Sequence, residues 1–179
     1  NNAMNNVAAV KGIDTLTEKG KKAFKELTQV AKNAAKEVKG TTYTDAANGL
    51  YYMALAGMDV TDKKVQSSLP SMLKAAKING TDIKETLDAV TDSMTALGLS
   101  TEKTAEYIDV CTAVQSSSNT NMLQLNEALI KSGAGMSSLG VDYKETASLI
   151  GIMASAGLKG SEAGTFLNSQ YSRLVKGSG

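Results

Sequence analysis

The amino-acid sequence predicts an all-α protein: a multi-helix domain built from a duplicated helical unit, preceded by an N-terminal amphipathic, coiled-coil-like helical arm. Three observations lead to this fold class. Apolar residues make up 42% of the chain and recur at steps of three and four residues, the spacing of one helix face. The chain contains a single proline, a residue that interrupts helices. Its aromatic residues are six tyrosines and two phenylalanines, a composition that disfavours β-sandwiches and barrels.

One stretch of sequence occurs twice. Residues 80–86 read GTDIKET, and residues 140–146 read GVDYKET. After each copy comes an apolar helical pattern that stops at a Gly-Leu pair, at Gly98 in the first copy and at Gly157 in the second. Self-similarity at a fixed period is typical of repeated helical units. We therefore expect two helical units that superpose.

These patterns divide the chain into three expected parts. They are a cloning remnant at residues 1–3, the helical arm at residues 4–40, and a core domain at residues 41–179. Within the core we expect internal repeats at about residues 62–120 and 122–179. Their central parts, residues 69–115 and 129–175, are expected to align in space.

The two repeated motifs, at residues 80–86 and 140–146, have the pattern of helix N-termini. In Gly-x-Asp-x-x-Glu the aspartate side chain accepts from backbone N–H groups of the first turn, and the glutamate reaches back to the cap. The first copy supplies Asp82 and Glu85. The second supplies Asp142 and Glu145. The alternative, paired carboxylates for acid–base catalysis, is disfavoured because one capping box explains both pairs.

Residues 4–40 hold eight lysines, four acidic residues and no arginine, a net charge of 8 − 4 = +4. Apolar and small residues alternate at three- and four-residue steps, as in a heptad seam. The seam consists of Ile13, Leu16, Gly20, Ala23, Leu27, Val30 and Ala34, widened by Phe24, Ala31 and Val38. Three interpretations stay open: a coiled coil through which the chain self-associates, a surface for an acidic partner, or a helix packed on its own domain. The absence of arginine disfavours a nucleic-acid patch.

The first part of the core is expected to contain three helices. One begins at Asp45 and ends at Gly57, and a short polar helix follows Asp62. Pro70 is expected at the first position of the next helix, where its missing N–H costs no hydrogen bond. That helix ends before Gly80, since glycine adopts a left-handed conformation without a Cβ clash.

The clearest helix of the chain follows. Its apolar face repeats at steps of four and three residues through Ile83, Leu87, Val90, Met94 and Leu97. Leu87 lies in the middle of this face. We therefore expect its side chain to be buried.

Ser100 is expected to cap the next helix, and a polar joint follows at residues 115–121. Residues 122–131 are expected to be helical. The glycine-rich segment at residues 132–140, SGAGMSSLG, is expected to form a flexible loop or a broken helix. The last helices are expected at residues 143–156 and 162–175.

The residue types predict no catalytic, cofactor-binding or metal-binding site. The chain has no histidine, the commonest general base and metal ligand. Cys111 is the single cysteine and falls on the apolar side of a helix, so we expect it to pack as a small hydrophobic residue. No run of eighteen apolar residues predicts a membrane span. We expect neither a cofactor, nor a small-molecule substrate, nor sequence-specific nucleic-acid binding.

The glycine-rich segment suggests two enzymatic sites, and both fail on sequence grounds. Gly133 and Gly135 have neither the spacing nor the preceding strand of a dinucleotide-binding loop. The segment is also similar to the Gly-Ala-x-Gly loop of lytic transglycosylases. Those enzymes need a Glu-Ser pair that supplies the general acid, and no Glu-Ser occurs in this chain.

Several segments together resemble the core region of phage tail tape measure proteins. They read SLPSMLKAAKINGTDI, ALGLS, LNEALIKSGAGMSSLGVD and ASAGLKGSEAGTFL, and the resemblance covers roughly residues 42–175. The most specific part is AGLKGSEAGT at residues 156–165. The family usually has an arginine after the following leucine, where this chain has Asn168, so a salt bridge at that position is not expected.

The resemblance implies a non-enzymatic structural protein of a long-tailed phage or prophage. Proteins of this family lie inside the tail tube, help to set tail length during assembly and act in genome delivery. The implied partners are tail tube and tail-assembly proteins, and the implied location is the virion after synthesis in the host cytoplasm. The alternative from another class is a bacterial helical adaptor unrelated to phage. A lytic transglycosylase is the third possibility.

Overall fold

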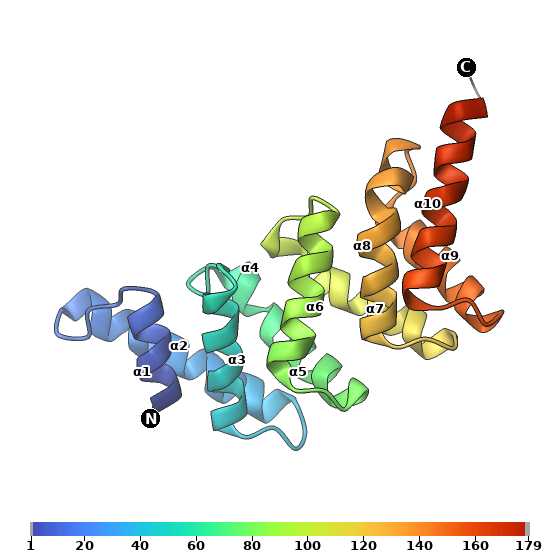
Figure 1. Cartoon of the computed structure of the whole chain (residues 1–179). Coiled ribbons are helices and arrows are strands. Elements are labelled where there is room, and N and C mark those ends of the chain that lie inside the picture. The colour runs from blue at the N-terminus through green and yellow to red at the C-terminus, as the bar shows by residue number, and fades with distance from the viewer. Residues whose placement is uncertain (1, 178–179) are drawn as a thin grey trace. The chain divides into compact units, whose positions relative to one another are not determined.

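The computed structural model describes residues 2–177, and this part of the chain consists of helices and connecting turns with no β-strand (Figure 1). This confirms the all-α fold class. The elements are α1 (Asn2–Val10), α2 (Glu18–Glu37), α3 (Tyr43–Leu55), α4 (Lys63–Gln66), α5 (Ser68–Asn79), α6 (Ile83–Ala96), the 3₁₀-helix η1 (Thr101–Lys103), α7 (Thr104–Ser117), α8 (Met122–Ser138), α9 (Tyr143–Ser155) and α10 (Gly160–Gly177).

The chain separates into two compact units. Unit 1 comprises the described residues up to Asp88 together with residues 101–105. Unit 2 comprises residues 89–100 together with the described residues from Glu106 onward. The segment expected to be an arm, residues 4–40, lies wholly within unit 1. The boundaries of the expected repeats stay a prediction.

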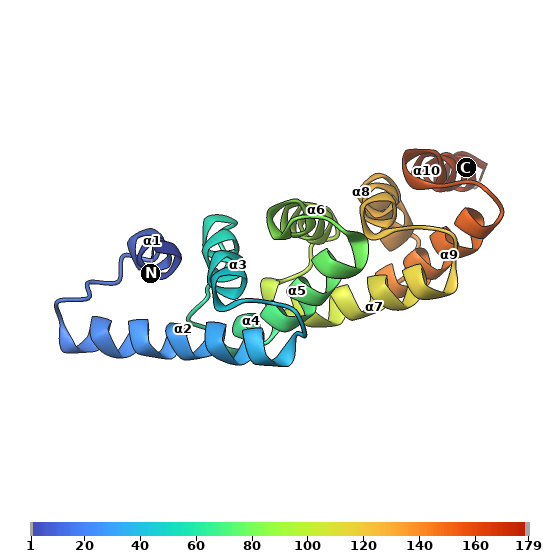
Figure 2. The ribbon, with the colours of Figure 1, turned by 90° about the horizontal axis from the view of Figure 1, so that it is seen from below.

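In unit 1, α3 is the central helix. Both α1 and α2 pack against it, and α5 contacts it as well. Figure 2 shows α1 and α3 in one layer, with α2, α4 and α5 in the other. The core between these layers contains Val7 of α1, Leu27 and Ala31 of α2, and Leu50 and Met53 of α3, each at most 2% exposed.

The seam pattern predicts one continuous amphipathic helix in the N-terminal segment. The structure differs, because the segment forms two helices, α1 and α2, with a connection between them. Gly12 follows α1 with a φ of 62°, and the chain remains non-helical until Thr17 caps α2 by accepting a hydrogen bond from the N–H of Gly20. The first two seam residues, Ile13 and Leu16, lie in this connection, and Leu16 is 86% exposed. The spacing of apolar residues alone cannot show such a break, because Gly12 is not one of the seam positions.

Much of the apolar side of α2 is buried inside unit 1, although the seam residue Val30 is partly exposed. Leu27, Ala31 and Ala34 are at most 3% exposed, on the side of α2 that faces the unit's core. Ala3, which falls in the segment expected to be a cloning remnant, is also buried, as part of α1. The structure therefore favours the interpretation in which this segment packs on its own domain.

Helices α3, α6 and α9 end in the same turn, in which a glycine with positive φ follows the helix, and α8 also ends in it at Gly140. The glycines are Gly57, Gly98 and Gly157 after α3, α6 and α9, with φ of 79°, 67° and 96°. In each case the N–H after the glycine donates to the carbonyl of a methionine five residues earlier. The acceptor and donor pairs are Met53 with Met58, Met94 with Leu99 and Met153 with Leu158, at 2.9–3.0 Å. This bond satisfies a carbonyl that the helix end would leave unpaired.

The starts of the same three helices are capped by short polar side chains, as the sequence predicts for two of them. Asp82 accepts from the N–H of Glu85 at 2.8 Å, and Asp142 accepts from the N–H of Lys144 at 2.7 Å. At α3, Thr42 and Asp45 form a complete capping box with bonds in both directions. The sequence comparison misses this third copy of the pattern because threonine replaces the capping aspartate.

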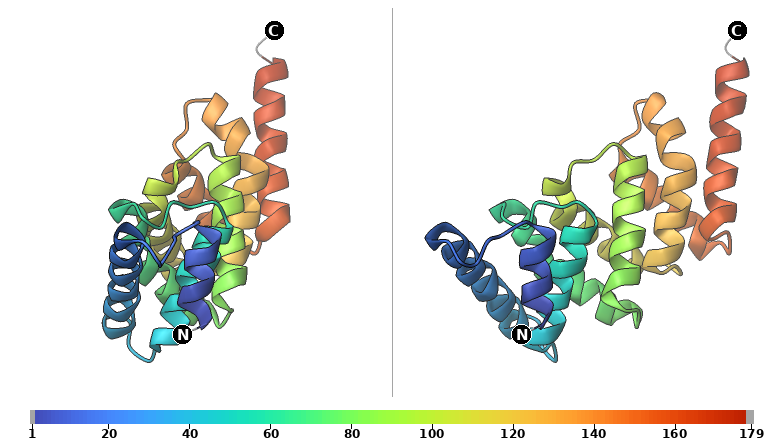
Figure 3. Two further views of the ribbon diagram at one scale, coloured as in Figure 1. Left: turned by 90° about the vertical axis from the view of Figure 1, so that its left-hand side faces the viewer. Right: turned by 60° about the vertical axis from the view of Figure 1, so that its left-hand side comes forward.

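In unit 2, α8 and α10 lie along each other (Figure 3), and α9 packs against α8. The prediction of a loop or broken helix at residues 132–140 is wrong, because α8 runs unbroken to Ser138. A Cβ added at Gly133 would lie 2.2 Å from Leu97 Cδ2, and one added at Gly135 would lie 2.9 Å from Tyr171 Cδ1. These glycines allow close packing, and this packing offsets their low helix propensity of about 1 kcal/mol each.

The apolar face predicted for α6 is largely confirmed. Leu87, Val90 and Met94 are at most 3% exposed, whereas Ile83 and Leu97 at the two ends are partly exposed. Pro70 lies at the third position of α5 instead of the first, because that helix begins at Ser68. It still falls in the first turn, where backbone N–H groups have no partner within the helix.

The two predicted repeats contain three α-helices each, in the same order along the chain. Residues 69–115 include α5, α6 and most of α7, and residues 129–175 include most of α8, α9 and most of α10. The duplication itself is not confirmed, since the first segment is divided between the two units and the second lies wholly in unit 2. Whether the two segments superpose stays a prediction.

Candidate interaction surfaces

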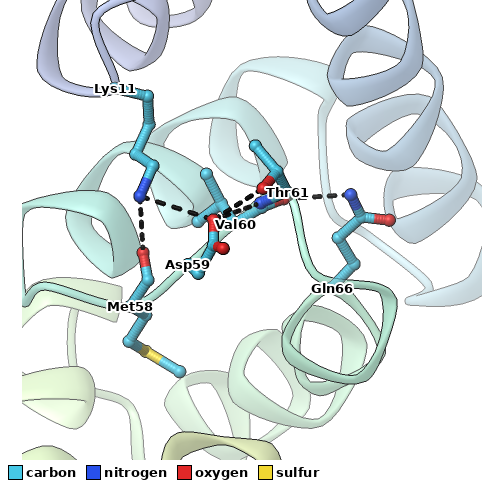
Figure 4. Close-up of polar contacts among 6 residues, drawn as sticks. All are labelled: Lys11, Met58, Asp59, Val60, Thr61 and Gln66. Atoms are coloured by element: carbon cyan, nitrogen blue, oxygen red, sulfur yellow. Dashed lines mark hydrogen bonds and ion pairs between the residues drawn. The ribbon is translucent and has the colours of Figure 1, made fainter.

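The loop after α3 is held by a small cluster of polar contacts within unit 1 (Figure 4). The carboxylate of Asp59 accepts from the hydroxyl of Thr61 at 2.7 Å and from its N–H at 3.1 Å. Lys11 Nζ lies 3.5 Å from the same carboxylate oxygen and 3.5 Å from the carbonyl of Met58. The cluster therefore ties the connection after α1 to the connection after α3.

The same contacts fix the charge state of this cluster. The two donors of Thr61 lower the pKa of the Asp59 carboxyl, and Lys11 lowers it further. Asp59 is therefore a carboxylate at neutral pH and cannot donate a proton. On the other side of the loop, Gln66 Nε2 donates to the carbonyl of Val60 at 2.9 Å. The arrangement positions a loop and offers no reactive group.

A cavity of about 360 Å³ lies between α3, α5 and the start of α6. Its lining combines apolar side chains such as Leu73 and Ile83 with the polar residues Thr41, Asp45 and Lys77. Asp45 is engaged in the cap of α3, and Lys77 Nζ donates to backbone carbonyls of residues 39 and 40. The charged groups of this cavity thus serve the fold, by closing the turn before α3.

A buried polar cluster connects helices within unit 2. The hydroxyl of Tyr107 on α7 hydrogen-bonds to Ser93 Oγ at 2.6 Å and to Asn126 Oδ1 on α8. The amide of Asn126 donates to the carbonyl of Met122 at 2.8 Å. All three polar side chains are at most 1% exposed, and burial raises the pKa of Tyr107 above its ordinary value. The cluster specifies how these helices face one another, because a buried polar group left unpaired is costly.

Cys111 is fully buried, as the sequence predicts. Burial raises the pKa of its thiol to about 12, so the thiol stays protonated at neutral pH. Since the thiolate is the reactive form, Cys111 is not a nucleophile in the folded chain. The residue acts as a small core side chain.

The other chemically suggestive residues also have structural roles. Asp82 and Asp142 cap helices, as described above, which confirms the aspartate part of the capping interpretation. The glycine-rich segment similar to a transglycosylase loop is part of helix α8. Residues 2–177 contain no group of three potential metal ligands, and none of their helices is long and apolar enough to cross a membrane.

One face of α9 forms an open hollow of about 530 Å³ within unit 2. It is lined by Val141, Lys144, Glu145, Ser148, Leu149 and Ile152. Ile152 is 68% exposed and Leu149 is 39% exposed, although both side chains are apolar. Lys144 forms an ion pair with Glu106 of α7 at the edge of the hollow. Such an apolar hollow with a charged edge is a candidate surface for a protein partner.

A second candidate surface is the lysine-rich side of α2. Lys21, Lys25, Lys32 and Lys36 are exposed and follow one another at steps of four, seven and four residues. This spacing places them on one side of the helix, opposite the buried residues. Lys21 pairs with Glu18 at 2.7 Å, a contact worth little at an exposed site. A charged stripe of this kind is usually a solvated face.

Comparison with known proteins identifies relatives. Residues 28–179 match the family described as phage-related minor tail protein. The chain is 33% identical over 132 residues to the tape measure protein of Pneumococcus phage Dp-1, which covers 74% of this chain and 11% of that protein. It is 29% identical over 130 residues to the probable tape measure protein of Escherichia phage P2, which covers 73% of this chain and 16% of that protein. No solved structure matches the chain significantly.

The chain thus spans less than a fifth of the length of either relative. Both relatives carry the name that the sequence resemblance implies. The match does not support the alternative of a helical adaptor unrelated to phage. Because the family match covers residues 28–179, which is most of the chain, this protein belongs to the family of phage-related minor tail proteins.

Proposed function

We propose that this chain is a folded, non-enzymatic module of a tail tape measure protein. It acts in tail assembly, and thereby in determining tail length, through contacts with tail tube and tail-assembly proteins. Its place is inside the tail tube of the virion, after synthesis in the cytoplasm of the bacterial host, and it takes part in genome delivery. The relatives are tape measure proteins by name, which supports the structural class.

One observation carries the distinction between a module and a ruler: the helices are short and fold back on one another. The longest described helix, α2, has 20 residues, which span about 30 Å. A single helix of 179 residues would span roughly 270 Å. Glycine turns end α3, α6 and α9, and within each unit the helices pack side by side. Such a region adds little length for its residue number, so its contribution is a folded binding unit.

The decisive experiment changes folding and residue number separately in the full-length gene. One variant deletes residues 42–175 in frame. The other keeps every residue but carries Leu87→Asp and Leu129→Asp, which place charges at two positions that are at most 1% exposed. If the module role is correct, both variants fail to assemble normal tails. A matched control, Leu55→Asp at a 53% exposed position, should assemble normally.

A ruler would give a different pair of results. The deletion would yield viable particles with tails shortened by about 1.5 Å for each residue removed. The double substitution, which removes no residue, would leave tail length unchanged. Electron microscopy of the particles measures both, and that pair of outcomes would refute the module role. Release of glycan fragments from cell walls by the purified chain would contradict the non-enzymatic part of the proposal.

Self-association through the N-terminal segment is a separate part of the proposed partner set. The buried half of the seam on α2 already packs inside unit 1. We therefore expect removal of residues 4–38 to lower the stability of the fold without changing the oligomeric state in solution. Sedimentation of both chains decides, since an intact dimer that becomes a monomer on truncation would instead establish a coiled coil.

A further inference from the structure

Helices α3 and α9 occupy equivalent frames in the sequence. Each has 13 residues, and each lies between two glycines 17 residues apart, Gly40 and Gly57 for α3 and Gly140 and Gly157 for α9. All four glycines have positive φ. Each position of α3 therefore corresponds to the position 100 residues later in α9.

On α3, one face of this frame is covered in part by another helix of unit 1. The positions are Thr41, Asp45, Asn48, Gly49 and Tyr52. A Cβ added at Gly49 would lie 2.7 Å from Leu69 Cδ1 of α5 and 2.9 Å from Ile83 Cδ1 of α6. The rest of the face lines the cavity that Leu73, Ala76 and Lys77 of α5 cover.

On α9, the equivalent face is open. The corresponding positions are Val141, Glu145, Ser148, Leu149 and Ile152, and all five line the hollow of about 530 Å³. Helix α7 packs beside this face, where a Cβ added at Gly151 would lie 2.8 Å from Val114 Cγ1. The exposed fractions of Leu149 and Ile152, 39% and 68%, show that no helix of the described chain covers these two side chains. The same frame is thus covered in one copy and uncovered in the other.

We propose that this face of α9 binds an amphipathic helix of a partner protein, with the side-chain pattern that α5 presents to α3. The pattern on α5 is Leu69, Leu73 and Ala76, at steps of four and three residues, followed by Lys77. Steps of this kind form the continuous apolar stripe by which one helix lies in the groove of another.

Charge supports the direction in which the partner helix lies. Lys77 of α5 lines the same cavity as Asp45 and donates to the carbonyls of residues 39 and 40, at the turn before α3. The position of Asp45 is taken in α9 by Glu145, another carboxylate. The partner helix therefore has a lysine at its C-terminal end, placed near Glu145 and the turn before α9.

One difference between the two faces sets the size of a partner residue. The frame has Gly49 in α3 and Leu149 in α9. Leu69 of α5 fits against Gly49 because no side chain is present there. Opposite Leu149 the partner needs a small residue such as alanine, since two leucines at this spacing would overlap. The inference depends on the fold alone and stands whether or not the chain sets tail length.

The test uses labelled peptides of residues 67–84, which contain α5 and the turn after it. A peptide carrying Leu69→Ala is titrated with the purified chain and followed by fluorescence anisotropy. We expect it to bind at least about tenfold more tightly than the unsubstituted peptide. Leu149→Ala in the chain should remove this preference. Ile152→Ser should weaken binding by about tenfold or more, whereas the matched exposed substitution Leu55→Ser on α3 should leave it unchanged.

Three results would overturn the proposal. One is the absence of binding up to about 1 mM chain, checked against a folded control by circular dichroism. Another is binding that Ile152→Ser does not weaken. The third is sedimentation showing that the chain dimerises and that Ile152→Ser abolishes the dimer, because the face would then be covered by a second copy and not by a partner helix.

Discussion

Helices α6 and α9 begin and end alike but differ in length by one residue. The spacing between the flanking glycines is 18 residues from Gly80 to Gly98 and 17 residues from Gly140 to Gly157. The helices themselves have 14 and 13 residues. Each starts at a capping aspartate. Each ends at a glycine turn in which the carbonyl of a methionine accepts a hydrogen bond from the N–H after the glycine.

Counted from their starts, the two helices bury most of the same positions. Thr86 and Thr146 are each 1% exposed, and Val90 and Ile150 are each fully buried. Counted from their ends, they differ. Five residues before the final glycine, α6 has Ser93, which is fully buried, whereas α9 has Ile152, which is 68% exposed.

One residue of helix explains this difference. Each residue turns an α-helix by about 100°, so a helix shortened by one residue presents a different side at its end. The capping motifs fix where a helix begins and ends. The register from the helix start decides which side chains reach the core: Asp92 and Ile152 stand at the same position from the start, and both are exposed. The shorter α9 reaches its glycine turn one residue earlier, so positions counted from the end differ.

The largest effect is expected at Leu87, which is 1% exposed in the middle of the α6 face. Leu87→Ala should lower the free energy of unfolding by about 2–5 kcal/mol, because it leaves a cavity in the core. Urea denaturation measures the change. Ile152→Ala on the exposed side of α9 is the matched control and should change stability by less than about 0.5 kcal/mol. An unchanged midpoint for Leu87→Ala would mean that the face is assigned incorrectly.

A smaller effect is expected at Ala147, the counterpart of Leu87 when positions are counted from the first glycine. Ala147 is fully buried, so its site is already filled. Ala147→Leu should cost about 1–3 kcal/mol through overpacking. If this variant is as stable as the parent chain in the same denaturation experiment, the two faces are interchangeable and the comparison fails.

The glycines before the two helices should respond equally. Gly80 and Gly140 have φ of 64° and 79°, and a Cβ added at either would meet no atom within 4 Å. Gly80→Ala and Gly140→Ala should therefore each cost about 1–2 kcal/mol, the backbone penalty of a left-handed residue with a side chain. Thermal unfolding of the two variants side by side measures this. A large inequality would show that one turn contains contacts that the other lacks.

The smallest effects are expected at the caps. Asp82→Ala and Asp142→Ala each remove an acceptor for a first-turn N–H, at a cost of about 1 kcal/mol. Asparagine at either position should restore most of the loss, because its side chain also accepts at this position. Stability that does not depend on these side chains would leave the shared start of the two helices without an energetic role.

The sequence contains the signals for most helix boundaries because those signals are local. A capping aspartate and a left-handed glycine act within a few residues, so Asp82, Asp142 and the glycines after α6 and α9 are predicted correctly. The unbroken course of α8 could not be predicted from local sequence. Leu97 packs against Gly133 and Tyr171 packs against Gly135, and each partner is at least 36 residues away in the sequence.

The candidate surface on α9 has a different reason for being missed. Leu149 and Ile152 read as ordinary helix residues, and nothing in their local sequence says that they face outward. Their exposure follows from their register from the helix start, where Ile152 matches the exposed Asp92 of α6, and from what covers each face. The buried position of Cys111, in contrast, follows directly from its place on an apolar stripe and is predicted correctly.

The orientation of α9 also determines which methionine of this chain is oxidised first. Of its eight methionines, seven are at most 8% exposed, and Met153 near the end of α9 is partly exposed. Peroxide reaches exposed thioethers first and converts them to the polar sulfoxide. Brief treatment of the folded chain with peroxide should therefore modify Met153 before Met94, its counterpart in α6 when positions are counted from the final glycine. A single sulfoxide, located by mass spectrometry, would make the rotation of this helix visible as a difference in reactivity.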